Sequence, residues 1–132
     1  MIVLDASVVI AYLETTDPHH EAAVRFMAAV IEELAISSVT LAEVLVGRID
    51  DGTERQVRDA ITEVMAVQVL VNADDEWPLD LARAKAKFRL RMPDAIVLAS
   101  AMRAGGTVAT FDKRLRTAAS AAGCLAEENG LW

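Results

Sequence analysis

The sequence has one cysteine and three prolines among 132 residues, and none of its apolar runs is long. The single thiol, Cys124, excludes a disulfide framework, so we expect a reduced, cytoplasmic protein. No apolar run approaches the ~18 residues of a membrane span, so no membrane association is expected. Asp5 interrupts the N-terminal apolar run and no basic region precedes it, which argues against a signal peptide.

The sequence also lacks the motifs of several proteins that handle phosphate. It contains no glycine-rich phosphate loop. The segment Asp5-Ala6-Ser7 supplies neither the paired acids of a receiver domain nor the Asp-x-Asp of haloacid-dehalogenase-type phosphatases. Internal repeats and low-complexity linkers are absent, so residues 1–132 are predicted to form a single domain.

Basic residues are fewer than acidic ones, 13 against 20, and the net charge is −7. The bases are unevenly distributed: residues 1–80 hold sixteen acids and four bases, whereas residues 81–132 hold four acids and nine bases. An acidic protein binds nucleic acid poorly as a whole, but a basic half can contact phosphates. Four bases in this half are candidates for such contacts: Arg89, Arg91, Lys113 and Arg114.

Apolar residues make up 54% of the chain, enough for a packed core. Short β-rich runs at 2–4, 34–36, 67–71 and 108–110, with a weak edge run at 124–126, predict about five strands. Between them, apolar spacing and capping residues predict helices at 8–14, 18–33, 38–47, 53–65, 74–89, 93–104 and 112–122. This alternation predicts an α/β fold with three layers, in which helices flank a short parallel sheet.

Four acidic residues differ from the others because they lie at the ends of apolar elements or inside them. Asp5 follows the first strand and Asp112 follows the fourth. Glu43 lies within an apolar helix, and Asp94 lies in the first turn of another. If the first and fourth strands are neighbours, a crevice opens between their carboxyl ends and these acids converge there. Because unpaired carboxylates are costly to bury, such a cluster calls for a common cation.

Each of these acids also has a purely structural explanation. An aspartate at a turn or a helix start can cap the free backbone amides. Ser7 can cap the first helix in the same way. Glu43 lies too far inside its helix to cap, so its alternative is a buried ion pair with Arg48 or Arg103. Capping explains single residues better than it explains four acids in this order.

Clustered carboxylates provide the hard oxygen ligands that suit Mg²⁺, with Mn²⁺ as a second candidate. Such an ion can polarise a phosphoryl oxygen and activate water, which makes a phosphodiester the natural substrate. The sequence leaves open whether one or two ions bind. It also leaves open another Mg²⁺-dependent phosphoryl-transfer enzyme on a similar fold.

Four segments in order resemble the PIN-domain ribonucleases, and chain length is most similar to their VapC-type toxins. They are VLDAS at 3–7, SSVTLAE at 37–43, MPDAIVLA at 92–99 and ATFDK at 109–113. The resemblance implies a Mg²⁺-dependent endoribonuclease with a five-stranded parallel sheet, usually homodimeric, that is paired with a small antitoxin. A PIN-like module that binds protein without catalysis is the alternative.

By position, the resemblance implies a catalytic role for four acids: Asp5, Glu43, Asp94 and Asp112. Metal binding is implied for the three aspartates among them. Ser7 and Thr110 match small hydroxyl residues that support the site. Some relatives carry a further acid shortly after the last aspartate, whereas here bases follow it, which argues against a complete second metal site.

Overall fold

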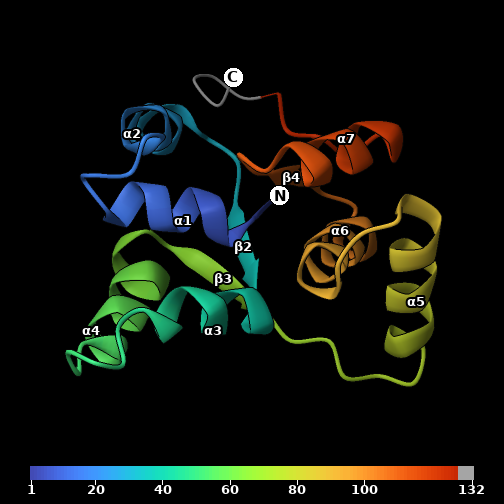
Figure 1. The fold of residues 1–132 in the computed structure, drawn as a ribbon, viewed down its shortest axis with the longest axis horizontal. Helices are drawn as coiled ribbons and strands as arrows, with labels where there is room; N and C mark the ends of the chain where they lie inside the picture. Colours follow the sequence, from blue (N-terminus) through green and yellow to red (C-terminus); the bar gives the residue numbers. More distant parts are fainter. Residues whose placement is uncertain (128–132) are drawn as a thin grey trace.

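A computed structural model describes residues 1–127, so the end of the predicted single domain, residues 128–132, lies outside the described part (Figure 1). Its strands are β1 (Ile2–Leu4), β2 (Leu34–Ser37), β3 (Val67–Leu70) and β4 (Thr107–Ala109). Its helices are α1 (Ala6–Leu13), α2 (His20–Ala29), α3 (Ser38–Val46), α4 (Glu54–Asp59), the π-helical turn η1 (Ala60–Val64), α5 (Trp77–Phe88), α6 (Met92–Ala104) and α7 (Lys113–Ala121).

The four strands form one parallel sheet in the order β3-β2-β1-β4. Ile2 pairs with Leu34 of β2 on one side and with Thr107 of β4 on the other. The chain builds outward from β1 through β2 to β3 and then crosses back to place β4 beside β1. The strand order therefore reverses between β1 and β4, so the condition under which the acids were expected to converge is met.

Helices cover both faces of the sheet, which confirms the three-layer α/β prediction. On one face, α1, α2, α3 and η1 enclose a core that includes Leu4, Phe26 and Ile36. On the other face, α6 and α7 pack over Val3 and Val108. Helix α5 lies outside this layer and packs on α6 (Figure 1). Helix α6 is therefore covered on both sides, which explains its uniformly apolar sequence.

The predicted fifth strand at 124–126 is wrong, because this segment makes a single parallel bridge rather than a ladder. The Val108 amide donates to the Cys124 carbonyl at 2.7 Å, and the Ala126 amide donates to the Val108 carbonyl at 2.9 Å. The pairing starts directly after a left-handed turn at Gly123, with φ of 72°. The sheet of the described residues therefore has four strands rather than about five.

Several predicted helix boundaries also differ from the structure. The helix expected at 74–89 is α5, Trp77–Phe88, and the one expected at 53–65 is divided between α4 and η1. The helix expected at 18–33 ends at Ala29, because Val30 is extended and leads to β2. A β-branched pair, Val30-Ile31, favours this extended exit. The first helix is capped by Asp5 rather than Ser7, which lies inside α1. In residues 1–127 no helix is long and apolar enough to cross a membrane.

Candidate active site

Two of the four acids lie where β1 and β4 end side by side. Asp5 directly follows β1 and is the N-cap of α1, where its Oδ1 accepts the Ala6 amide at 2.9 Å. Asp112 follows β4 and is the N-cap of α7, where its Oδ1 accepts the amides of Arg114 and Leu115. The capping explanation is therefore correct for both residues, and it uses only one carboxylate oxygen of each.

The other two acids come from helices that border the same crevice. Asp94 is buried in the first turn of α6, which packs on β1 and β4. It is not a cap, since Arg91 occupies that position. Glu43 lies in the middle of α3, which contacts α6. Glu43 is exposed, although apolar neighbours in the sequence suggested burial.

Two hydroxyl groups join Asp5 to the loop that carries Asp112. Thr110 Oγ1 donates to Asp5 Oδ2 at 2.7 Å and accepts the Asp112 amide at 2.9 Å. Ser7 Oγ donates to the same Asp5 oxygen at 2.7 Å and accepts the Phe111 amide at 3.1 Å. The structure thus places both predicted support residues between the carboxyl ends of β1 and β4.

The direction of these hydrogen bonds orients both hydroxyl groups. A backbone amide can only donate, so each hydroxyl accepts from an amide and keeps its own proton to donate to Asp5 Oδ2. One lone pair of Asp5 Oδ1 then stays available, as does Asp112 Oδ2, which accepts no hydrogen bond within residues 1–127.

The acids influence one another electrostatically. Desolvation in the crevice raises the pKa of Glu43, and the negative charges of Asp5 and Asp94 raise it further. Desolvation also raises the pKa of Asp94, with added contributions from Asp112 and Asp5. These interactions connect all four carboxylates into one cluster. Like charges crowded in this way favour either a proton or a cation between them.

Arg91 contributes the positive charge nearest to this cluster. Its Nε lies 3.7 Å from Asp94 Oδ2, and its charge lowers the pKa of both Asp94 and Glu43. The sequence suggested only a phosphate contact for Arg91. The ion pair could have been found from the three-residue spacing, because residues i and i+3 are neighbours on a helical turn.

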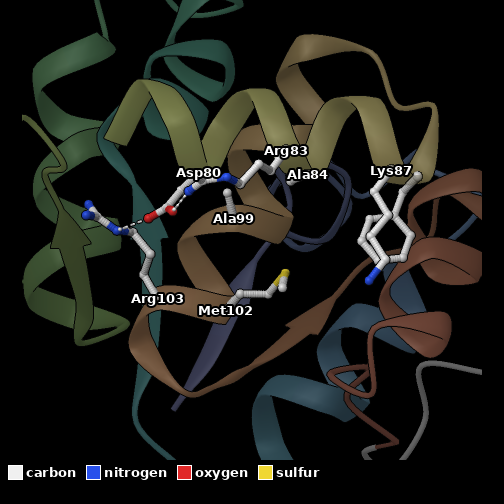
Figure 2. Close-up of a pocket in the computed structure, with 8 residues that line it drawn as sticks. Asp80, Arg83, Ala84, Lys87, Ala99, Met102 and Arg103 are labelled. Atoms are coloured by element: carbon white, nitrogen blue, oxygen red, sulfur yellow. Dashed lines mark hydrogen bonds and ion pairs between the residues drawn. The ribbon is translucent and has the colours of Figure 1, made fainter. Parts of the chain in front are cut away.

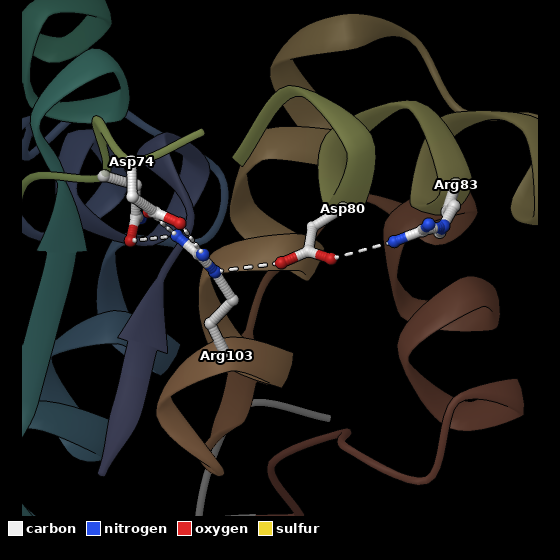
Figure 3. A network of polar contacts seen from close by, with 5 residues as sticks. Asp74, Asp80, Arg83 and Arg103 are labelled. Atoms are coloured by element: carbon white, nitrogen blue, oxygen red, sulfur yellow. Dashed lines mark hydrogen bonds and ion pairs between the residues drawn. The ribbon is translucent and has the colours of Figure 1, made fainter. Parts of the chain in front are cut away.

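The ion-pair alternative for Glu43 is wrong. Arg48 binds Glu14 at 2.5 Å, on the far end of α1. Arg103 binds Asp74 through two hydrogen bonds of 2.6 and 2.7 Å, and its Nε lies 3.0 Å from Asp80 (Figure 3). Both arginines are thus engaged elsewhere, and Glu43 has no basic partner within ion-pair distance among residues 1–127.

Three of the four predicted phosphate contacts line one groove of about 400 Å³. Arg89 reaches it from the end of α5, where it has a left-handed conformation with φ of 53°. Lys113 and Arg114 reach it from the first turn of α7, and Thr117 adds a hydroxyl group. Lys113, which lines this groove, directly follows Asp112 in the sequence.

The donor chemistry of the cluster fits a divalent cation with oxygen ligands. Within residues 1–127, no group of three or more acidic, histidine or cysteine side chains is arranged to hold a metal ion directly. Mg²⁺ does not require such a cage, because it commonly keeps several waters and binds through one or two carboxylates. Asp5, Asp94 and Asp112 are the residues that would hold it.

Comparisons with known proteins agree with this architecture. The model of the PIN domain family matches residues 2–121. VapC20 of Mycobacterium tuberculosis, a toxin that cleaves the sarcin-ricin loop, superposes with a TM-score of 0.70 at 20% identity, covering 97% of this chain and 99% of that one.

Two further structures are similar. A toxin–antitoxin complex from Klebsiella pneumoniae has a TM-score of 0.70 at 23% identity, covering 85% of this chain and 87% of the other. FitAcB from Neisseria gonorrhoeae has a TM-score of 0.67 at 21% identity, covering 91% and 94%. No curated protein sequence matches. Because the family model spans nearly the whole sequence, the chain belongs to the PIN domain family.

Proposed function

We propose that this protein is a Mg²⁺-dependent endoribonuclease that acts as the toxin of a toxin–antitoxin pair in the cytoplasm. The observation that carries the proposal is the cluster of four mutually interacting carboxylates at the point where strand order reverses. Membership of the PIN domain family and the likeness to toxin structures support the same activity.

The residues of the cluster have separable roles. Asp5, held by two hydroxyls, presents one fixed oxygen, and Asp112 presents its second oxygen from the adjacent strand end. A divalent ion bound there would neutralise charge that develops on the phosphoryl group. Glu43, whose pKa is raised and which is exposed to the crevice, is the candidate to take a proton from an attacking water.

The substrate is proposed to be RNA, whose backbone follows the groove lined by Arg89, Lys113 and Arg114. These cations neutralise phosphates beside the scissile bond, which offsets the repulsion between an anionic strand and an acidic protein. Arg91 pairs with Asp94 at 3.7 Å and is 70% exposed, so its guanidinium could release Asp94 and contact the strand.

An antitoxin partner and a homodimer complete the proposal. Helices α1 and α3 border the crevice and leave apolar side chains exposed: Ile10 by 37%, Val39 by 50% and Val46 by 70%. A small protein that covers them could insert an arginine or lysine into the acid cluster and block it. A solved toxin–antitoxin complex with this fold supports the proposal of an antitoxin partner.

A cleavage assay on total RNA, with Mg²⁺ or with a chelator, tests the proposal. We expect cleavage by the wild type only with Mg²⁺, and a loss of at least about 100-fold in Asp5→Asn, Asp94→Asn and Glu43→Gln. Asp75→Asn, in an exposed segment far from the cluster, is the matched control and should keep full activity. Binding of a partner without any cleavage would identify a non-catalytic module instead.

A further inference from the structure

Helices α5 and α6 enclose a second cavity that shares no residue with the acid cluster. Its volume is about 420 Å³, and it is lined by Asp80, Arg83, Ala84, Lys87, Phe88, Ala99, Met102 and Arg103 (Figure 2). This volume lies in the range of sites for small molecules, ~300–1,000 Å³. The cavity exists because small residues, Ala84 on α5 and Ala99 on α6, line it where larger side chains would close the gap.

The floor of this cavity is apolar and adaptable. Ala84 and Ala99 are nearly fully buried, whereas Met102 of α6, which also lines the cavity, is 51% exposed (Figure 2). An unbranched thioether can change rotamer at low cost, so Met102 can move with the shape of an occupant. Phe88 adds an aromatic wall near the end of α5.

At one end of the cavity, acidic and basic side chains form ion pairs with one another. Asp80 lies 3.0 Å from Arg103 Nε and 3.5 Å from an Arg83 nitrogen (Figure 3). Arg103 is also bound by Asp74, so its donors are already occupied. Each arginine at this end thus has a carboxylate within ion-pair distance.

The other end carries a cation without an acidic partner. The Lys87 ammonium lies 5.4 Å from the centroid of the Phe88 ring, and no carboxylate within residues 1–127 forms an ion pair with it. An ammonium at the edge of an apolar cavity attracts an anion whose remaining surface is apolar.

We propose that this cavity binds small amphipathic anions, such as a medium-chain carboxylate. The aliphatic body packs against Ala84, Ala99 and Met102, and the anionic head accepts hydrogen bonds from Lys87. Such a ligand joins α5 to α6 by burying apolar surface from both helices. A cationic analogue is repelled by Lys87, and a neutral alcohol loses the charge-assisted hydrogen bond.

The test is a titration of the ¹⁵N-labelled full chain with octanoate, followed by amide chemical shifts. We expect saturable shifts confined to α5 and α6, with binding of octanol about tenfold weaker and no binding of octylammonium. Lys87→Gln should weaken octanoate binding about tenfold and leave octanol unchanged. Lys85→Gln, an exposed lysine on the same helix that does not line the cavity, should bind like the wild type.

A second variant separates binding in the cavity from a general surface effect. Met102→Glu places a carboxylate at an exposed position of the lining and should abolish octanoate binding without affecting the fold. Non-saturating or scattered shifts in the wild type would overturn the proposal. Equal octanoate affinity in wild type, Lys87→Gln and Met102→Glu would overturn it as well.

Discussion

Thr110 shows how single hydroxyl groups organise the candidate site. It is fully buried, and its Oγ1 both donates to Asp5 and accepts from the Asp112 amide. Thr40 is equally buried, but its Oγ1 has no hydrogen-bond partner in residues 1–127. The two threonines therefore form a natural comparison between a hydroxyl that positions charged groups and one that does not.

Thr110→Val should destabilise the fold by ~1–3 kcal/mol, because the isosteric change removes the acceptor of the Asp112 amide and one of the two donors to Asp5 Oδ2. Thr40→Val should change stability little or increase it, since it removes an unpaired buried hydroxyl. Urea unfolding of both variants at pH 7 measures this difference. Equal effects of the two substitutions would show that Thr110 contributes packing only.

Sequence reasoning located the acids because strand ends and helix starts can be recognised from short patterns. Asp5 and Asp112 could be placed once two apolar runs were identified as neighbouring strands. The exposure of Glu43 could not be predicted, because apolar neighbours along a helix do not show which side faces a crevice. The capping role of Asp5 rather than Ser7 depends on where β1 ends, and a shift of two residues is within the ordinary uncertainty of helix boundaries.

At the scale of elements, one arginine links α5 and the segment before it to α6, in addition to the packing between the two helices. Arg103 on α6 binds Asp74 in the segment before α5 and Asp80 in its first turn, and its guanidinium lies 5.4 Å from the Trp77 ring centroid. The hydrogen bonds from Arg103 lower the pKa of Asp74 to about 2. This connection was not predicted, because the two partners are 29 residues apart in sequence.

Arg103→Gln should increase hydrogen exchange in residues 72–81 while the sheet stays protected, because the segment loses its link to α6. Arg83→Gln, whose contact with Asp80 is a single exposed one at 3.5 Å, is the matched control and should exchange like the wild type. Hydrogen exchange with mass spectrometry measures both. Unchanged protection in Arg103→Gln would mean that apolar packing alone holds α5.

The stability that the contact between Arg103 and Asp74 contributes should fall in acidic solution. The folded pKa of Asp74 lies below its ordinary value of 3.8, so its contribution to stability is present above pH 3.8 and is lost as pH falls toward about 2. The extra exchange of Arg103→Gln relative to the wild type should therefore disappear in strongly acidic solution.

The four strands of the sheet were predicted from the sequence, whereas the predicted fifth strand was wrong. Four runs contain buried, mostly apolar residues and form the sheet as expected. Residues 124–126 have the same composition, but they meet β4 for one bridge only. Apolar composition predicts that a segment is buried. The number of residues that pair with the neighbouring strand depends instead on the direction in which the preceding turn leads the chain.

At the scale of the whole molecule, the uneven distribution of acidic and basic residues predicts how RNA binding depends on salt. The neutralising substitutions Arg89→Gln, Lys113→Gln and Arg114→Gln, taken together, should reduce the salt dependence of binding to single-stranded RNA by about 2 in logarithmic slope. Binding is measured in chelator, so that cleavage does not interfere. The control neutralises Arg25, Arg55 and Arg58, which changes the net charge equally but lies outside the groove. Equal slopes in both triple variants would remove the groove from the binding site.

The coupling between the acids also predicts how stability depends on pH. The folded pKa of Asp94 is raised above 3.8, so the folded state binds protons more tightly there than the unfolded chain. Stability from this group therefore falls as pH rises through the folded pKa, and the carboxylate destabilises the protein at neutral pH. Asp94→Asn should relieve this repulsion, and its stabilising effect should shrink as the solution is acidified.

The central claim is that four carboxylates form one cation-binding cluster. Thermal melts of the wild type and of Asp94→Asn test it most directly. Both proteins are melted at pH 7.5 and fixed ionic strength, first in chelator and then in Mg²⁺. In chelator the variant should melt above the wild type. Mg²⁺ should stabilise the wild type, by ~2.7 kcal/mol at a hundred times its dissociation constant, and the variant much less. A wild type that does not respond to Mg²⁺, together with a variant that melts lower in chelator, would contradict the account.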